Sequence, residues 1–381
     1  MTKEIKNLKK AAQRILKAIK KKEKIIIYGD SDMDGVSSVI ILKECIKNLG
    51  GENLKIYFSD REKDGYGINK KTLEKLKDEA PALFITLDFS IEVSKELDVV
   101  KKKGFEVIIV DHHDISNKNP NADIFVNPKQ KGDRYPFKYF ATVGIVFRLA
   151  NLILKDRMTV NLRKDFLELA ALATIADMMP RIDDNEEIIM EGLASLKESW
   201  RPGIQALFAL ESFKSLVLME QINKINSLLN IRDVEEGMPA SFRLLISFDR
   251  KEAGQLVEKL LEKIIEKKKK IKEVLRIVEA AIAGKKDSVI FEGSSGWELV
   301  LLGVAAAILA QKYQRPAFLY RKDKTESQGS IRAPKGYNVV EAMKTCSKYL
   351  ESYGGHAQAA GFRIKNKNLE KFKDCLIEYF D

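Results

Sequence analysis

Residues 24–35 read KIIIYGDSDMDG, a short apolar run that ends in three closely spaced aspartates. The run is rich in β-branched residues, which predicts a buried β-strand. Asp30, Asp32 and Asp34 follow it at alternate positions. Carboxylates packed this closely repel one another unless a cation neutralises them, and hard divalent cations prefer oxygen ligands. The stretch therefore predicts a buried strand that leads directly into a metal site.

A calcium-binding EF-hand loop begins with the same spacing of aspartates and is the main alternative metal site. Such a loop needs a glutamate at its twelfth position, where this chain has Ile41. An EF-hand loop also follows a helix, whereas the residues before Asp30 predict a strand. We therefore exclude the EF-hand, and a structural turn whose aspartates cap the next helix stays open as the other alternative.

The pattern of a short apolar run followed by an aspartate occurs four times in the first third of the chain. The runs cover residues 24–28, 54–58, 82–87 and 105–110, and the aspartates are Asp30, Asp60, Asp88 and Asp111. Helix-length amphipathic segments separate the runs, which predicts a parallel α/β sheet. Ligands of open parallel sheets bind beyond the carboxyl ends of the strands. We therefore expect the four aspartates to converge on one crevice.

The chain has only three histidines, and His112 and His113 are adjacent, directly behind Asp111. An imidazole in a carboxylate site shifts the preference from Mg²⁺ toward Mn²⁺ or another transition metal. Asp88 and Asp177 fit the same site, since Asp177 follows the apolar segment FLELAALATIA, where an uncompensated carboxylate is costly. Each of these two aspartates could instead be a cap or turn residue. Two metal ions in such a site could activate a water for attack on phosphate.

The rest of the chain predicts a second domain behind a long helix. Residues 140–260 are mostly helical in pattern, and the apolar positions between 253 and 282 recur at helical spacing until Gly284. A helix of this length spans about 45 Å. We predict a catalytic domain over residues 1–250 with its parallel sheet at about 24–130, a connecting helix over 251–284, and a smaller α+β domain over 285–381, with strands around two helices.

The second domain contains two segments suited to phosphate, QGSIR at 328–332 and YGGHAQAAG at 353–361. A glycine pair allows close backbone approach to a ligand, and a hydroxyl beside a guanidinium suits phosphate oxygens. A glycine-rich turn without a ligand remains the alternative for the second segment. The candidate substrate-binding residues are Ser330, Arg332, Gly354, Gly355 and His356.

The composition of the chain indicates which kinds of partner and which cellular compartment to expect. A net charge of +11 and a pI near 9.2 fit a polyanionic substrate, although abundant Lys and Glu also occur in heat-adapted proteins with solvated helix faces. No long apolar run or signal peptide is present, which predicts a cytoplasmic protein without a membrane segment. Cys45, Cys346 and Cys375 form no CxxC pair, so we predict small buried residues rather than a disulfide or a zinc site.

The ordered motifs D-x-D-x-D-G, D-H-H, T-I-A-D-x-x-P and G-G-H-x-x-A-A-G resemble the DHH phosphoesterases with their DHH-associated C-terminal domain, most closely the RecJ-like single-strand nucleases. The resemblance runs from Lys24 to Ile364. It implies two bound Mn²⁺ ions, with Mg²⁺ as the alternative, and hydrolysis in an interdomain groove. The implied metal ligands are Asp30, Asp32, Asp34, Asp88, His112 and Asp177, with Asp88 shared between the ions. His113 would stabilise charge beside the scissile phosphate, Asp111 would orient the histidine pair, and the candidate substrate-binding residues would hold the nucleic-acid backbone.

Two segments depart from the family pattern. Where bacterial members carry R-I-N-x-x-G-R, residues 221–227 read QINKINS, and where the second domain usually carries H-P-G, this chain has Trp297, Glu298 and Leu299. The chain also ends without the oligonucleotide-binding barrel of the bacterial members. It resembles in this respect the compact archaeal relatives that associate with the GINS replication complex, which implies a GINS-type partner.

The leading hypothesis is a metal-dependent exonuclease of DNA repair and replication that hydrolyses single-stranded DNA, with RNA as a further substrate. One alternative is a phosphodiesterase for short oligoribonucleotides or cyclic dinucleotides. The other is a replication-complex scaffold with little activity. Scaffolds of this fold have lost metal ligands, whereas every carboxylate of the motifs and both histidines are present here.

Overall fold

The structure is a computed structural model that describes residues 4–381 except 61–66, 69, 90–94, 116–119 and 232. The chain forms two compact units, Met1–Leu261 and Glu262–Asp381. Among the helices within these described ranges, none is long and apolar enough to cross a membrane.

The first unit is built on a five-stranded parallel sheet, as the repeated apolar runs predict. The strand order β2-β1-β3-β4-β5 places β1 between two strands that follow it in sequence. Every residue of β1 and β3 is buried, which explains why these runs are continuously apolar rather than alternating. The strands are β1 (Ile25–Gly29), β2 (Leu54–Phe58), β3 (Ala82–Leu87), β4 (Phe105–Val110) and β5 (Ile124–Val126).

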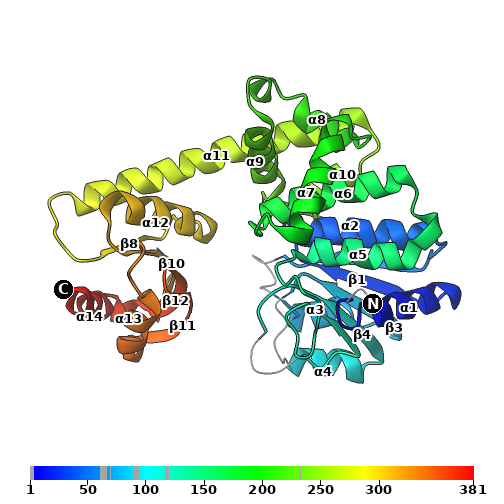
Figure 1. The fold of residues 1–381 in the computed structure, drawn as a ribbon. Coiled ribbons are helices and arrows are strands. Elements are labelled where there is room, and N and C mark those ends of the chain that lie inside the picture. Colours follow the sequence, from blue (N-terminus) through cyan, green and yellow to red (C-terminus); the bar gives the residue numbers. More distant parts are fainter. Residues whose placement is uncertain (1–3, 61–66, 69, 90–94, 116–119, 232) are drawn as a thin grey trace. The chain divides into compact units, whose positions relative to one another are not determined.

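Helices cover both faces of this sheet (Figure 1). Side chains at alternate positions along the strands, such as Ile26, Phe84 and Val107, point to one face of the sheet. They pack there against Leu76, which follows α3, and Leu97 of α4. Complete burial of one such side chain contributes about 1.5 to 3 kcal/mol. Helices α2 and α5 cover the opposite face (Figure 1). The helices are α1 (Leu8–Lys20), α2 (Met33–Asn48), α3 (Lys70–Lys75), α4 (Lys95–Lys102) and α5 (Thr142–Leu154).

A helical part completes the first unit. The buried helix α6 ends one residue before Asp177, as the apolar segment predicts. The elements of this part are α6 (Val160–Ala176), α7 (Asp183–Ser195), α8 (Pro202–Phe208), α9 (Leu218–Leu229), α10 (Ala240–Ile246) and a hairpin of β6 (Val234–Glu235) and β7 (Met238–Pro239).

One continuous helix, α11 (Arg250–Ile282), runs from the first unit into the second, which confirms the predicted long helix. Its 33 residues span about 50 Å at the usual rise per residue. Asp249 caps its start by accepting hydrogen bonds from the amides of Lys251 and Glu252 at 2.7 and 2.9 Å. Gly284, at a φ of 76°, follows its end.

The second unit is an α+β fold on a five-stranded mixed sheet of order β11-β12-β10-β9-β8, in which only the β8–β9 pair is parallel. The sequence predicts four of these strands, and the structure places the glycine pair Gly354–Gly355 and His356 inside a fifth strand, β11. The elements are β8 (Ile290–Ser294), α12 (Leu299–Tyr313), β9 (Ala317–Lys322), β10 (Glu326–Arg332), α13 (Val339–Thr345), β11 (Leu350–His356), β12 (Ala359–Lys365) and α14 (Leu369–Phe380).

The prediction that all three cysteines are unpaired is wrong for two of them. Cys346, at the end of α13, forms a disulfide with Cys375 of α14, with 6.0 Å between the Cα atoms. Met343 and Phe372 belong to the same buried cluster, so the packing of the two helices brings the sulfurs together. Sequence spacing did not reveal this contact, because the cysteines are 29 residues apart. Cys45 is free and buried, as expected.

Replacing Cys346 with Ser should lower the free energy of unfolding of the second unit by about 3 to 4 kcal/mol, since a loop of this length is no longer closed in the unfolded chain. Thermal unfolding in the absence and presence of a thiol reductant measures the effect. Reduction should bring the wild type to the stability of the variant and leave the variant unchanged. A wild type that is indifferent to complete reduction would contradict the prediction.

Candidate metal centre

The residues that directly follow the five parallel strands form one row along the carboxyl edge of the sheet. The backbone pairing of the strands continues by one residue, because the amide of Asp30 donates to Leu87 O at 3.2 Å and the amide of Asp88 donates to Val110 O at 3.1 Å. Equivalent bonds lead from Ser59 to Gly29 and from Asp111 to Val126. Across the sheet the row consists of Ser59, Asp30, Asp88, Asp111 and Asn127.

This row confirms the expected convergence for three of the four strand-end aspartates. Asp60 lies one position beyond Ser59 and belongs to none of the acidic and histidine groups found in the described part of the chain. Ser59 takes the place in the row and donates its hydroxyl to Asp30 Oδ1 at 2.7 Å. Asp60 is therefore not part of this row, because Ser59 and not Asp60 directly follows β2.

The turn between β1 and α2 supplies two further carboxylates. Asp32 is the N-cap of α2 and accepts a hydrogen bond from the amide of Gly35 at 3.1 Å, and Asp34 lies buried in the first turn. A Cβ atom at Gly35 would lie 2.4 Å from the carbonyl oxygen of Asp30, so only glycine allows this tight turn. The capping alternative is thus correct for Asp32, yet its carboxylate also faces the metal-ligand side chains.

The two histidines have different neighbours. His112 is buried, and its Nε2 lies 3.4 Å from Asp177 Oδ2, 3.5 Å from Asp88 Oδ1 and 3.9 Å from Asp34 Oδ2. His113 Nδ1 lies 2.7 Å from Asp111 Oδ1 and is half-buried. The hydrogen bond of Asp111 therefore goes to His113, while His112 faces the carboxylates of three separate elements.

The acidic and histidine side chains form three overlapping groups in which one ligand atom of each residue lies within 4.8 Å of the others. Two of the groups share Asp88 and two share His112. Such overlapping groups would suit two neighbouring ions. The groups are Asp30, Asp32 and Asp88; Asp34, His112 and Asp177; and Asp88, His112 and His113.

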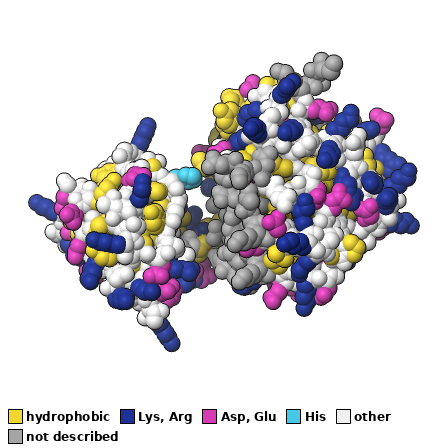
Figure 2. Space-filling view, turned by 90° about the horizontal axis from the view of Figure 1, so that it is seen from below, with side chains coloured by type: hydrophobic (Ala, Val, Ile, Leu, Met, Phe, Trp, Pro, Cys, Tyr) yellow, Lys and Arg dark blue, Asp and Glu magenta, His cyan; other side chains and the backbone are white. Residues whose placement is uncertain are grey.

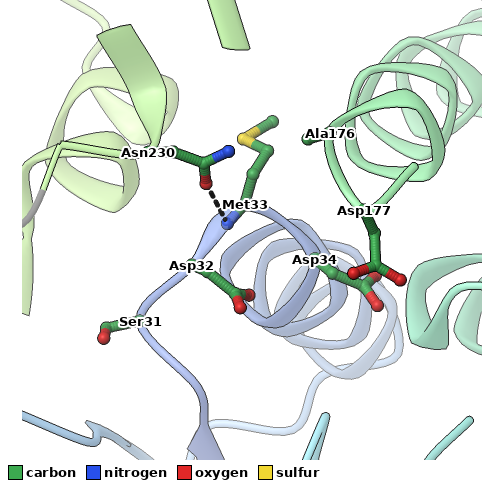
Figure 3. A pocket seen from close by; sticks show the side chains of 7 residues that line it. All are labelled: Ser31, Asp32, Met33, Asp34, Ala176, Asp177 and Asn230. Atoms are coloured by element: carbon green, nitrogen blue, oxygen red, sulfur yellow. Dashed lines mark hydrogen bonds between the residues drawn. The ribbon is translucent and has the colours of Figure 1, made fainter. Parts of the chain in front are cut away.

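A pocket of about 220 Å³ opens beside these groups (Figure 3). The carboxylates of Asp34 and Asp177 lie side by side, although they come from two different helices (Figure 3). Oδ2 of Asp177 is buried and accepts no hydrogen bond from any residue that the structure describes. Carboxylate oxygens are ligands for both Mg²⁺ and Mn²⁺, a neutral imidazole favours Mn²⁺, and a buried acceptor without a donor fits a metal ligand. The pocket is lined by Ser31, Asp32, Met33, Asp34, Ala176, Asp177 and Asn230.

Burial and mutual repulsion shift the titration of these groups in the metal-free protein. Burial, followed by the charges of neighbouring aspartates, raises the pKa of Asp34 and of Asp88 well above the usual range. The same causes raise the pKa of Asp177 to about 6. Burial and the adjacent His113 lower the pKa of His112 to about 4, which keeps its imidazole neutral and able to bind a metal near pH 7. Burial opposes protonation of His113, but the hydrogen bond and charge of Asp111 raise its pKa overall.

These shifts predict that stabilisation by Mn²⁺ grows as the pH rises. Between about pH 4 and 6, Asp177 is protonated in the folded, metal-free protein but ionised in the unfolded chain. The folded protein therefore binds more protons, and its free energy of unfolding falls as the pH rises through that window. A bound cation requires the deprotonated carboxylates and removes their repulsion. The midpoint of thermal unfolding, compared in Mn²⁺ and in chelator, should differ more at pH 8 than at pH 5. An increase that is the same at both pH values would contradict this account.

Three residues of the centre were not predicted from the sequence. Asn127 ends the row and donates to Asp111 Oδ2 at 3.4 Å and to the carbonyl oxygen of His113 at 3.0 Å. Thr142 contacts Asp34 and Asp88 from the start of α5. Asn230 accepts a hydrogen bond from the amide of Met33 at 2.9 Å (Figure 3). Only Asn127 had a detectable signal, because it follows an apolar run just as the aspartates do.

The two segments that depart from the family pattern have structural roles here. Gln221 and Asn226 of α9 donate to the carbonyl oxygens of Phe213 and Leu172, so both side chains fix the helical part. Trp297 is buried in the cluster that joins α12 to the end of α11. In both places, side chains that could have faced a ligand are committed to packing or to internal hydrogen bonds.

Four of the five candidate substrate-binding residues share one face of the second sheet. Ser330 pairs with Gly361, which pairs with Gly354, and Arg332 pairs with Ala359, which pairs with His356. Directly paired residues of antiparallel strands and residues two apart on one strand point to the same face. Ser330, Arg332, Gly354 and His356 therefore lie on one face.

Gly355 points to the other face and has a local structural role. It adopts a φ of 137°, and a Cβ atom there would lie 2.5 Å from the carbonyl oxygen of Ala359. Glycine at this position therefore lets β11 and β12 approach each other. The sheet itself therefore requires glycine at position 355, in addition to the substrate-binding role that the resemblance implies.

Arg332 is a half-buried cation. Burial lowers its pKa, and among the residues that the structure describes no carboxylate lies within ion-pair distance of it. A Cβ atom at Gly303 would lie 3.1 Å from Arg332 Nη2, so the glycine leaves room for the guanidinium beside α12.

The Lys and Arg side chains on the face drawn in Figure 2 are spread among acidic ones. Net positive charge alone therefore does not mark a binding surface on that face.

The fold and the centre define a class of protein: a parallel α/β unit with a carboxylate and histidine metal site at its sheet edge, linked by a helix to an α+β unit. The model of the DHH family, N-terminal domain, matches residues 24–174, and that of the DHHA1 domain matches residues 286–381. The chain belongs to the DHH family.

Individual relatives agree with this assignment. The chain is 33% identical to the single-stranded-DNA-specific exonuclease RecJ of Bacillus subtilis over 99% of its own length and 48% of that protein. It is 28% identical to the RecJ of Thermus thermophilus, over 98% of this chain and 54% of the relative. The chain thus spans about half the length of these two relatives.

Solved structures show the same fold. A manganese-bound exonuclease RecJ superposes with a TM-score of 0.82 at 26% identity, covering 100% of this chain and 95% of that one. RecJ of Thermus thermophilus in complex with Mn²⁺ gives a TM-score of 0.80 at 25% identity, covering 100% of this chain and 55% of that one. The predicted fold, a parallel-sheet DHH domain joined by a long helix to a smaller α+β domain, is confirmed.

Proposed function

We propose that the chain is a metal-dependent exonuclease that hydrolyses phosphodiester bonds of single-stranded DNA, with RNA as a further candidate substrate. The observation that carries this proposal is the convergence of five aspartates and one neutral imidazole at the carboxyl edge of the parallel sheet. The relatives of the same two-domain build that are named single-stranded-DNA-specific exonucleases support the choice of reaction.

The ligands divide between two ions. Asp30, Asp32 and Asp88 would hold one, and Asp34, His112 and Asp177 the other, with Asp88 adjacent to both sets. The bound ions supply Lewis acidity and a water of lowered pKa as the nucleophile. Because His112 contributes a nitrogen ligand, Mn²⁺ is the preferred ion and Mg²⁺ the second choice.

His113 and Asp111 serve the phosphate rather than the ions. The hydrogen bond that His113 Nδ1 donates to Asp111 favours the protonated imidazole, which places a positive charge next to Asp88. A cation held in this way stabilises the negative charge that develops on the phosphate oxygens during attack. Asn127 fixes this pair, since it binds both the carboxylate of Asp111 and the backbone of His113.

The second unit would hold the strand through its phosphates. The guanidinium of Arg332 has no internal carboxylate partner in the described chain, and the hydroxyl of Ser330 and the imidazole of His356 share its face. Such charged and neutral donors bind phosphate oxygens without reading the bases. Binding should therefore weaken steeply between about 50 and 200 mM salt.

Digestion of end-labelled DNA and RNA strands of several lengths, with Mn²⁺ or Mg²⁺, tests the proposal. Ladders that shorten from one end support an exonuclease and reveal its polarity. Much faster loss of two- to five-nucleotide RNA would instead favour the oligoribonucleotide phosphodiesterase. Asp34→Ala and His112→Ala should abolish hydrolysis with the fold intact. Equal activity in wild type and variants would contradict the proposed enzyme and leave the replication-complex scaffold as the remaining hypothesis.

A GINS-type partner is a further part of the proposal, and it rests on the resemblance to compact archaeal relatives. Size-exclusion chromatography of the full chain mixed with a purified GINS complex tests it. Co-elution supports the association, and separate elution at micromolar concentrations of both proteins contradicts it.

A further inference from the structure

The start of α5 is hydrogen-bonded to two aspartates that belong to different ligand groups. The amide of Thr142 donates to Asp34 Oδ2 at 2.7 Å, and the amide of Val143 donates to Asp34 Oδ1 at 2.8 Å. The hydroxyl of Thr142 donates to Asp88 Oδ1 at 3.0 Å. Thr142 is fully buried. Thr142 thus contacts one carboxylate from each of the two sets that would hold an ion.

These bonds hold Asp34 in a fixed orientation. The N-cap of α5, Ala141, has no side chain that could bind the free amides of the first turn, and the carboxylate of Asp34 takes that role from 108 residues away. Because each oxygen of Asp34 accepts one amide, the plane of the carboxylate cannot rotate without loss of a hydrogen bond. The two hydrogen bonds from α5 therefore fix the direction in which the remaining lone pairs of the Asp34 oxygens point.

The bond to Asp88 is different, because it depends on the side chain of Thr142. Asp88 adopts a φ of 68°, a left-handed conformation that is uncommon for a residue other than glycine. The helix does not need the hydroxyl of Thr142, since backbone amides already bind Asp34. A valine at position 142 would keep those amides and the shape of the side chain and would remove only the bond to Asp88.

We propose that Thr142 is a positioning residue that fixes the spacing between the two metal-ligand groups, by joining Asp34 of one group to Asp88 of the other. The inference rests on the proposed metal-dependent function. Outer-shell hydrogen bonds of this kind orient ligating carboxylates, and their loss typically costs about 10- to 100-fold in metal affinity or activity.

The test compares Thr142→Val, Thr142→Ser and a matched control, Thr86→Val. Thr86 is also fully buried and lies in β3, two residues before Asp88, but its hydroxyl has no hydrogen-bond partner among the described residues. The measurements are Mn²⁺ titration calorimetry and the electron paramagnetic resonance spectrum of the Mn²⁺-loaded protein, whose spin coupling depends on the distance between the two ions. Circular dichroism establishes that each variant is folded.

We expect Thr142→Val to weaken Mn²⁺ binding about 10-fold or more and to alter the spin-coupled spectrum. Thr142→Ser, which keeps the hydroxyl, and Thr86→Val should resemble the wild type in both measurements. If Thr142→Val does not fold, Thr142→Ala, which also removes the hydroxyl, takes its place: weakened binding with an altered spectrum supports the role of the hydroxyl, and wild-type affinity and spectrum in the folded variant contradict it.

The failures of this inference and of the proposed function differ. Wild-type affinity and spectrum in a folded Thr142→Val protein would overturn the role of Thr142 and leave the metal site intact. A wild type that binds no Mn²⁺ at millimolar concentrations would overturn the proposed function, and the inference with it.

Discussion

Asp88→Asn is expected to lower the rate of Mn²⁺-dependent hydrolysis about a thousandfold or more, because metal ions contribute several kcal/mol to the stabilisation of the transition state. Asp88 belongs to the set proposed for one ion, and its Oδ1 lies 3.5 Å from His112 Nε2 of the set proposed for the other, so its loss should affect both sites. Asparagine keeps Oδ1 as the acceptor for Thr142 and tolerates the φ of 68° at this position. The substitution therefore removes a charge and little else.

The same substitution should stabilise the metal-free protein. Burial and the charges of Asp34 and Asp32 raise the pKa of Asp88, which means that its ionised form opposes folding near pH 7. Thermal unfolding in chelator should show a higher midpoint for Asp88→Asn than for the wild type, together with a smaller increase on addition of Mn²⁺. Loss of activity combined with a lower metal-free midpoint would indicate a damaged fold instead.

Asp123→Asn is the matched control for this experiment. Asp123 precedes β5, and its Oδ2 accepts a hydrogen bond from the amide of Val107 at 2.8 Å, near the edge of the sheet opposite the metal centre. It undergoes the same change of charge without contact to any ligand group in the described chain. Its hydrolysis rate should remain within about twofold of the wild type, as expected for a surface change. An equal loss in both variants would refute a specific role for Asp88.

The parallel sheet could be predicted because burial on both faces makes its strands continuous apolar runs. The runs at residues 24–28, 54–58, 82–87 and 105–110 correspond to β1–β4, with β1 displaced by one residue. Strand ends then indicate candidate metal ligands, since parallel strands present their carboxyl ends at one edge. The strand β5 was missed because its run of three residues, Ile124–Val126, is much shorter than the other four runs and is followed by an asparagine rather than an aspartate. Asn127 was missed with it.

Contacts between segments distant in sequence could not be predicted. The amides of Thr142 and Val143 reach Asp34 only after α5 has packed against α2, and no residue type signals a backbone donor. The disulfide between Cys346 and Cys375 likewise depends on how α13 and α14 pack. The strand β11 was not predicted because glycine is depleted in strands, whereas here Gly355 permits the close approach of β12.

Arg201→Met is expected to reduce the free energy of unfolding of the first unit by about 3 to 5 kcal/mol, because it leaves a buried carboxylate without its cation. Arg201 and Asp165 are both almost completely buried, and Nε and Nη2 of the guanidinium each lie 2.6 Å from one oxygen of the carboxylate. Nη1 donates in addition to the carbonyl oxygen of Leu245 at 2.5 Å. The side chain thus ties α6 and α10 to the start of α8, and urea unfolding measures its contribution.

Two further variants separate the charge from the hydrogen bonds. Arg201→Lys keeps the charge but loses the planar pair of bonds, so an intermediate loss is expected. The double variant Arg201→Met with Asp165→Leu removes both charges and should recover most of the stability lost in the single variant. Recovery should stop about 1 to 3 kcal/mol short of the wild type, because the carbonyl group of Leu245 remains buried without a donor. A double variant no more stable than Arg201→Met would show that packing around Arg201, rather than the unpaired carboxylate, determines the loss.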